Sequence, residues 1–212
     1  CAAGPGGDLG SRRRRPGRPD PVGRGALGGV RRDRGLRGLE RPIGRLVGGG
    51  TGTGKSTVAT EIAYRLGSTR VTSTDFIRQT MRAVFSHEFM PSIHYSSFEA
   101  GLAVPDAEDP LVAGFLEQSR QVLVGVRASL ERALQEGWSL VLEGVHLVPG
   151  LLPTAVENAL VTACVLEISD ETAHAQHFFT RDAGTQRAMT KYLDRFDEIR
   201  QLQRYLVGRA ER

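Results

Sequence analysis

Residues 45–57 read Arg45-Leu46-Val47-Gly48-Gly49-Gly50-Thr51-Gly52-Thr53-Gly54-Lys55-Ser56-Thr57. The part from Gly49 to Ser56 fits the pattern G-x-x-x-x-G-K-[ST] of a phosphate-binding loop. A short apolar run ends at Val47, and apolar residues at helical spacing follow from Val58 to Leu66. The glycines are therefore expected at a turn between a strand and a helix, in an α/β fold built around a polyphosphate site.

The loop has the residue types that a polyphosphate needs. Glycines let successive backbone N–H groups point inward, and the following helix adds its unpaired first-turn N–H groups and its positive dipole end. We expect Lys55 to reach the terminal phosphates of ATP or GTP and the Ser56 hydroxyl to bind Mg²⁺. Lys55 is one of only two lysines among 28 basic residues, and a bulkier guanidinium would not replace its compact ammonium easily. The predicted nucleotide-binding residues are Gly49, Gly50, Thr51, Gly52, Thr53, Gly54, Lys55, Ser56 and Thr57.

The basic character of the chain is confined to its first residues. The 212 residues have a formal net charge of +4, yet residues 1–45 hold 12 arginines against four acidic residues, which leaves residues 46–212 with a net charge of −4. Residues 1–44 are rich in Gly, Arg and Pro without apolar periodicity, which predicts a disordered leader. A nucleic-acid-binding arm is the alternative for this leader. Residues 45–212 have the length of one α/β domain.

Neither a membrane protein nor a disulfide-stabilised protein is indicated. No apolar run approaches the roughly 20 residues of a membrane span, and no signal-peptide core is present. The two cysteines, Cys1 and Cys164, give no disulfide framework and no metal-ligand spacing. Cys164 lies in an apolar run and is expected to be a small buried residue. A cytoplasmic location is the resulting expectation.

The second and third predicted strands each lead to an acidic residue. Asp75 follows a strand near residues 70–74 and is expected to cap the helix that continues to Phe85, or to face the ligand, or both. Glu143 ends a buried strand near residues 138–142, after a long helix predicted over residues 110–137. Phosphate-loop proteins keep a carboxylate on the Mg²⁺ side at this place, so Glu143 is a candidate for orienting a metal-bound water, and a solvent-exposed acid is the alternative.

Two irregular segments are further candidates for function. Residues 86–110 form a long connection that contains Ser96 and Ser97, whose neutral side chains could hold a small polar substrate. A helix around residues 153–159 is predicted to lead to a fourth strand near residues 160–168. Helices are then predicted over residues 171–179 and 190–209. The segment between those helices suits a lid, in which Arg181 and Arg187 would bring positive charge to the transferring group. Arginines on a solvated helix end are the alternative.

Several stretches together resemble the 2-phosphoglycerate kinase family of P-loop kinases. The matching stretches are residues 49–57, 72–78, 94–100, the Glu-Gly-Val-His-Leu-Val-Pro-Gly of residues 143–150, and residues 191–200. The resemblance implies a three-layer P-loop NTPase sandwich with a mostly parallel sheet. It also implies transfer of a phosphoryl group from ATP to the hydroxyl of 2-phosphoglycerate, giving 2,3-diphosphoglycerate, with Mg²⁺ as cofactor.

The resemblance also suggests roles for residues around the phosphate loop. Asp75 would face the acceptor hydroxyl, while Ser56 and Glu143 would serve the metal. The remaining substrate-binding candidates are Arg78, Arg82 and His94 for the phosphate and carboxylate of the acceptor, together with Ser96, Ser97 and His146.

The chain departs from the family pattern in one important respect. Four strands are expected, near residues 45–48, 70–74, 138–142 and 160–168, where P-loop kinases usually have five. We therefore expect a carboxy-terminally truncated chain that lacks the fifth strand and its adenine-facing loop. A kinase for another small acceptor, such as a sugar acid or an inositol phosphate, is one alternative function. A non-catalytic ATP-binding regulatory module is another. The sequence leaves the oligomeric state open.

Overall fold

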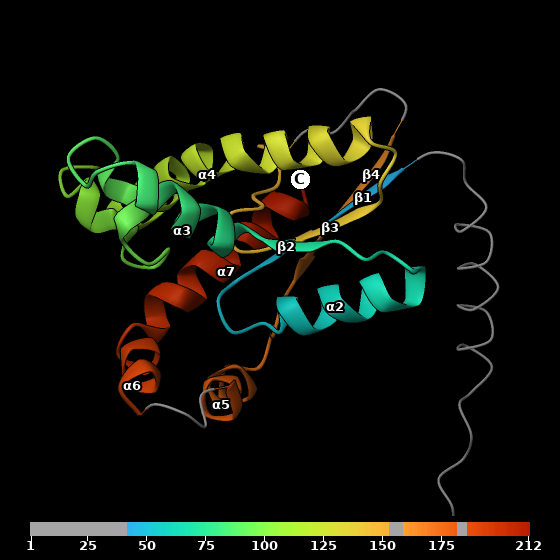
Figure 1. Ribbon diagram of the computed structural model, residues 1–212. Coiled ribbons are helices and arrows are strands. Elements are labelled where there is room, and N and C mark those ends of the chain that lie inside the picture. Colours follow the sequence, from blue (N-terminus) through green and yellow to red (C-terminus); the bar gives the residue numbers. More distant parts are fainter. Residues whose placement is uncertain (1–41, 153–158, 182–185) are drawn as a thin grey trace, which may run out of the picture.

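The computed structural model describes residues 42–152, 159–181 and 186–212, with the side chains of residues 180–189 outside the description. Apart from its last three residues, the leader expected at residues 1–44 also lies outside the described residues. The elements, shown in Figure 1, are β1 (Ile43–Gly49), α2 (Lys55–Leu66), β2 (Val71–Ser73), α3 (Thr74–Val84), the 3₁₀ helices η1 (Pro91–His94) and η2 (Ala100–Ala103), α4 (Pro110–Gln135), β3 (Leu140–Glu143), β4 (Leu160–Leu166), α5 (Glu171–Arg181), α6 (Gln186–Asp194) and α7 (Phe196–Ala210).

The four strands of the described residues form one parallel sheet in the order β2-β3-β1-β4. Leu46 of β1 lies opposite Leu142 of β3 on one side and Ala163 of β4 on the other. Because all strands run in the same direction, their carboxyl ends share one edge, where ligands collect in open α/β sheets. The α/β sandwich of the P-loop NTPase type is confirmed, and β1 begins two residues earlier than expected, at Ile43.

Helices cover both faces of the sheet, as Figure 1 shows for α4 on one side and α2 on the other. Successive residues of a strand point to opposite faces. Accordingly, Leu46 joins a core with Val122 and Val126 of α4, whereas Val47 packs with Ala59 and Ala63 of α2. β3 is buried along its whole length, as is typical of strands between two helical layers. A further cluster, which includes residues of α4, α5 and α7, lies beside the carboxyl edge.

The start of α3 differs from the prediction, because Ser73 and not Asp75 is the N-cap. Ser73 has an extended backbone, and its Oγ accepts a hydrogen bond of 3.0 Å from the N–H of Phe76. Serine is among the best N-cap residues, and it stands directly at the strand end. Asp75 is therefore the second residue of the helix and keeps its carboxylate for other partners.

Two other expectations were wrong. The helix predicted over residues 190–209 is divided into α6 and α7 at Arg195, whose φ of −117° and ψ of 24° leave helical geometry. The break allows α6 to contact Glu99 through Lys191 while α7 packs against β4 and α4. Cys164 is exposed, because β4 is the outermost strand of the described sheet. A helix expected near residues 153–159 falls almost entirely outside the described residues.

Within the described part of the chain, we find no helix both long enough and apolar enough to span a bilayer.

Candidate functional site

The phosphate loop joins β1 to α2 and is shaped by glycines with positive φ. Gly49, Gly52 and Gly54 have φ values of 143°, 86° and 79°, which side chains larger than hydrogen disfavour. The N-terminus of α2 begins at Lys55 without a side-chain cap and without an acidic residue in its first turn. Its first N–H groups are therefore directed at the loop with no side chain to neutralise them, which is the arrangement that binds anions at helix ends.

The side chains of the loop point into the same space. Lys55 Nζ donates a 2.7 Å hydrogen bond to the carbonyl of Gly50, and Thr53 Oγ1 donates one of 2.9 Å to the same carbonyl. The ammonium group is thus held inside the curve of the loop, where the terminal phosphates of a nucleotide would lie. The predicted nucleotide-binding residues 49–57 are contiguous in space as well as in sequence.

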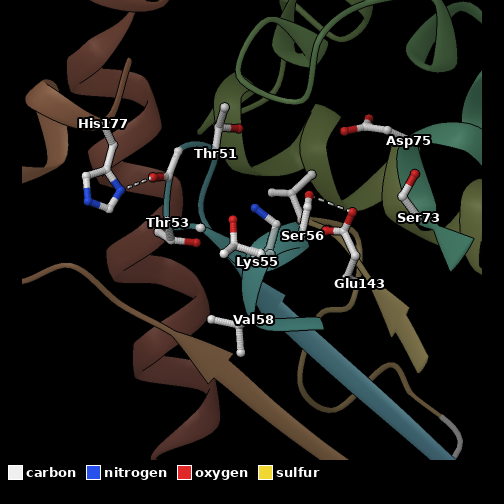
Figure 2. Close-up of a pocket in the computed structure, with 13 residues that line it drawn as sticks. Thr51, Thr53, Lys55, Ser56, Val58, Ser73, Asp75, Glu143 and His177 are labelled. Carbon is white, nitrogen blue, oxygen red and sulfur yellow. Dashed lines mark hydrogen bonds between the residues drawn. The ribbon is translucent and has the colours of Figure 1, made fainter. Parts of the chain in front are cut away.

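Ser56 and Glu143 are brought together from α2 and β3. Ser56 Oγ donates a 2.9 Å hydrogen bond to Glu143 Oε1, drawn as a dashed line in Figure 2, and the Glu143 side chain is buried. One hydroxyl and one carboxylate suit Mg²⁺, which is usually held by one or two carboxylates with water and substrate phosphates. The described residues contain no cluster of three or more His, Cys, Asp or Glu that could hold a metal ion without such phosphates.

A cavity of about 700 Å³ opens at the carboxyl edge of the sheet. Its walls are the loop residues 51–58, Ser73 and Asp75 from the start of α3, Glu143 and Val145 after β3, and His177 of α5. Figure 2 shows Asp75 across the cavity from Lys55, with Ser56 and Glu143 between them. Of the predicted catalytic and metal-binding residues, Lys55, Ser56, Asp75 and Glu143 therefore share one cavity.

Arg78 is a predicted acceptor ligand that lies one turn from Asp75 but is engaged by the protein. It is buried, with Nε 3.3 Å from Asp75 Oδ1, and its Nη1 donates to the carbonyls of Ile93 and Tyr95 at 2.9 and 3.0 Å. The two hydrogen bonds to carbonyl groups fix the segment around η1, and the ion pair joins Arg78 to the exposed carboxylate of Asp75. Arg78 thus links the predicted acceptor segment to the cavity.

The other predicted acceptor residues do not line this cavity. Arg82 bonds to Gln79 at 3.2 Å, and His94 Nε2 lies 3.1 Å from the carbonyl of Phe85. Ser96 Oγ accepts a hydrogen bond from Lys191, and Ser97 is buried. Their roles in binding a substrate stay predictions.

The two arginines of the predicted lid lie at the helix ends on either side of the segment between α5 and α6. Arg181 is the last residue of α5, and Arg187 is the second residue of α6. The segment of residues 182–185 between them lies outside the described residues, as do both arginine side chains, so their role also stays a prediction.

His146 was predicted to contact substrate, but the structure places it in the interior. It is 0% exposed, with Nδ1 2.8 Å from Thr74 Oγ1 and Nε2 2.9 Å from Gln118 Oε1. The pKa of His146 is lowered to about 4, mainly by burial, with the charge of Asp75 opposing the shift and the charges of Arg78 and Lys55 adding to it. The ring is neutral at pH 7.

Sequence reasoning missed two histidines that hold the phosphate loop from α5. His174 Nε2 donates to the carbonyl of Thr51 at 2.8 Å, and His177 Nδ1 donates to the carbonyl of Gly52 at 3.0 Å. Behind the loop, a Cβ added to Gly52 would lie 2.5 Å from Phe178 Cζ. The His-x-x-His spacing on a predicted helix was the available signal, because residues three apart share one helix face.

Arg200 of α7 supports this contact from behind. Its Nη1 donates to the carbonyl of Ile168 at 2.6 Å and lies 3.4 Å from His174 Nδ1. Burial lowers the pKa of His174, and the charge of Arg200 lowers it further, although the hydrogen bond to Thr51 opposes both. A neutral ring with its proton on Nε2 satisfies both neighbours, since Arg200 can only donate.

Comparison with known proteins identifies similar sequences over most of the chain. It is 41% identical over 177 residues to the 2-phosphoglycerate kinase of Methanopyrus kandleri, covering 81% of this chain and 54% of that protein. It is 42% identical over 167 residues to the one from Thermococcus kodakarensis, covering 78% and 57%, and 39% identical over 184 residues to the one from Methanothermobacter thermautotrophicus, covering 84% and 60%. The chain thus spans little more than half the length of these curated relatives. No family model matches it.

Proposed function

The chain belongs to the 2-phosphoglycerate kinase family, and we propose that it forms part of an enzyme that transfers the γ-phosphoryl group of ATP to the hydroxyl of 2-phosphoglycerate. The products would be 2,3-diphosphoglycerate and ADP. One observation carries this proposal: a single cavity joins a phosphate loop, a serine–glutamate pair and, opposite them, the carboxylate of Asp75. A site that only binds nucleotide does not need that second carboxylate.

In this proposal, the loop and the N-terminus of α2 bind the β- and γ-phosphates. The N–H groups and the Lys55 ammonium would stabilise the charge that spreads over the transferring group. Lys55 would exchange its hydrogen bond with the Gly50 carbonyl for one with a phosphate oxygen. Residues Arg181 and Arg187 would add charge from the side of α5 and α6.

Ser56 and Glu143 would hold Mg²⁺ on the same phosphates. Bound there, the ion would neutralise charge on the β- and γ-oxygens and help to align them. Ser56 would turn its hydroxyl lone pairs toward the ion, and Glu143 would orient a coordinated water. Their present hydrogen bond shows that the two side chains are close enough to share such a ligand.

Asp75 would receive the proton of the acceptor. As the acceptor oxygen forms a bond to the γ-phosphorus, the bond from that phosphorus to the bridging oxygen of ADP breaks, and the hydroxyl proton passes to Asp75. Arg78 contacts Asp75 and would bring positive charge near the phosphate and carboxylate of 2-phosphoglycerate. Arg82, His94, Ser96 and Ser97 are the weaker members of this acceptor set, since none of them lines the cavity or, like Arg78, pairs with Asp75.

Three wider assignments complete the proposal. We assign a cytoplasmic location, a leader at residues 1–44 that takes no part in catalysis, and a kinase domain at residues 45–212 with a helical lid near residues 171–209. Nucleic acid is not an expected partner except through the arginines of that leader.

The test is ADP release by the full chain over a panel of acceptors. The panel contains 2-phosphoglycerate, 3-phosphoglycerate, sugar acids, inositol phosphates and RNA, with ³¹P spectroscopy to identify the product. Asp75→Asn should reduce turnover by roughly 100-fold or more, as expected for loss of a general base, while binding of ATP changes little. Asp197→Asn, at an exposed position of α7, is the matched control and should retain wild-type turnover.

Each outcome of this panel separates the candidate functions. Turnover confined to sugar acids or inositol phosphates would reject 2-phosphoglycerate as the acceptor. Binding of ATP without ADP formation from any acceptor would instead favour a regulatory module. Full turnover by Asp75→Asn would remove Asp75 from the mechanism.

A further inference from the structure

His146 is a fully buried polar residue with no direct part in the proposed chemistry. It follows Glu143 by three residues, and its ring stacks on Phe115 of α4 with centroids 6.5 Å apart. Both ring nitrogens bond to protein groups, Nδ1 to Thr74 and Nε2 to Gln118. A buried imidazole with two specific partners has a defined orientation. The hydrogen bonds of His146 can therefore fix the segments to which Thr74 and Gln118 belong.

The direction of each hydrogen bond follows from Gln118. Its amide nitrogen lies 2.5 Å from the carbonyl of Ser92 and 3.1 Å from that of Tyr95, and carbonyls only accept. The oxygen of the Gln118 amide must therefore accept from His146 Nε2–H. With its proton on Nε2, His146 has a lone pair on Nδ1, so the hydroxyl of Thr74 donates to that nitrogen.

The two hydrogen bonds that join Thr74, His146 and Gln118 form a relay. Its first end, Thr74, fixes the start of α3. Thr74 is the first residue of that helix, directly before Asp75. The backbone of β3 approaches it closely, because a Cβ added to Gly144, which has a φ of 150°, would overlap the Thr74 side chain. The carboxyl end of β3 and the first turn of α3 are thereby joined, which sets Asp75 relative to Glu143.

The second end of the relay fixes the segment around η1. The carbonyl of Tyr95 accepts from both Gln118 and Arg78, and Arg78 in turn faces Asp75. Asp75 is therefore held from two directions, through its neighbour Thr74 and through Arg78. Both paths lead back to the same buried ring.

We infer that His146 is a positioning residue that acts through Thr74 and Gln118 to hold Asp75 at its place across the cavity from the phosphate loop. The inference rests on the proposed function for the role of Asp75. It replaces the predicted contact of His146 with substrate by an indirect role.

Two replacements of His146 separate the two ends of the relay. In His146→Asn, the amide oxygen takes the place of Nδ1 and can still accept from Thr74. In His146→Gln, the amide nitrogen takes the place of Nε2 and can still donate to Gln118, but nothing accepts from Thr74. Thr74→Val removes the same bond from the other side, and Thr162→Val, at an exposed position of β4, is its matched control.

The kinetic experiment measures kcat and KM for both substrates in the full chain. His146→Gln and Thr74→Val should each lower kcat by about 100-fold, the scale of a 1 Å misplacement of a reacting group. The KM for ATP should stay within about threefold, because the phosphate loop is not part of the relay. His146→Asn should retain kcat within about tenfold of wild type, and the His146→Gln/Thr74→Val double variant should be no slower than the slower single variant. Equal losses in the Asn and Gln variants would overturn the inference.

A second measurement works whether or not 2-phosphoglycerate is the acceptor. The amide protons of Arg78 and Gln79, whose helical acceptors are the carbonyls of Thr74 and Asp75, report on the first turn of α3 by hydrogen exchange. We expect His146→Gln and Thr74→Val to accelerate this exchange by at least roughly tenfold, and His146→Asn and Thr162→Val to leave it near wild type. Unchanged exchange in all four variants would refute the positioning role. The expected exchange pattern in a chain that forms no ADP would instead reject the proposed function and keep the positioning of α3.

Discussion

Acid should destabilise this protein through His146 in a pH range where carboxylates are still largely ionised. The ring is fully buried and its pKa is about 4, against about 6.5 in an unfolded chain. Below pH 6.5, His146 binds a proton in the unfolded state but stays unprotonated in the native state until the pH approaches 4. The stabilisation of the native state by the neutral His146 ring is therefore fully present above pH 6.5 and is lost progressively as the pH falls toward 4.

The size of the effect follows from the shift. One pKa unit corresponds to about 1.4 kcal/mol, so lowering the pH from 7.5 to 5.0 should remove roughly 2 kcal/mol from the free energy of unfolding. The groups that act on the ring are Asp75, Arg78 and Lys55.

Urea unfolding of the full chain at several pH values measures this loss. Other histidines and the carboxylates also titrate, so the informative quantity is the difference between wild type and His146→Asn, which cannot titrate at this position. At pH 7.5 the variant should be the less stable protein, because it loses the bond to Gln118. At pH 5.0 that difference should shrink by roughly 2 kcal/mol or change sign.

A difference that stays constant within about 0.5 kcal/mol from pH 7.5 to 5.0 would refute the reasoning. It would mean that His146 is protonated or solvated in the native state, and the hydrogen-bond directions assigned to Thr74 and Gln118 would no longer follow.

Two further substitutions test the contacts on either side of the cavity. Gly144→Ala should destabilise the chain by about 1–3 kcal/mol in urea unfolding, since its φ is positive and its Cβ would meet Thr74. Gly67→Ala, with a φ of 66° and open space around it, should cost only about 1 kcal/mol, and equal losses would argue against the contact. Arg200→Met should weaken ATP binding by roughly tenfold in calorimetry, because His174 loses its support behind the loop. Unchanged affinity would show that the loop does not depend on that support.

The features that sequence predicted well are those determined locally. The phosphate loop is a contiguous pattern, and its conformation depends on glycines that the pattern itself specifies. The strand that ends at Glu143 was also predicted, because a buried apolar run ending in an acid is recognisable without its partners. In the structure this strand, β3, pairs with β1, which places Glu143 beside the loop. Lys55, Ser56 and Glu143 do lie together in one cavity, while their catalytic and metal-binding roles stay predictions.

The features that sequence predicted poorly depend on partners far along the chain. Asp75 was expected to cap α3, but Ser73 was equally near and has the extended backbone that a cap needs. His146 could not be distinguished from a substrate ligand, since its burial depends on Gln118 and Phe115 of another helix. Cys164 lies in an apolar run that predicts burial, but its exposure depends on the position of β4 in the sheet.

The cavity is held by two networks that share no described hydrogen bond. On the side of α5 and α7, His174 and Arg200 hold the carbonyl of Thr51 and so the shape of the phosphate loop. On the side of α3 and α4, His146 and its partners hold Asp75. If phosphoryl transfer is positioning and charge neutralisation, damage to the first network should appear in nucleotide affinity and damage to the second in kcat. Because the two networks share no hydrogen bond among the described residues, variants from different networks should have nearly additive effects, whereas variants within one network should not.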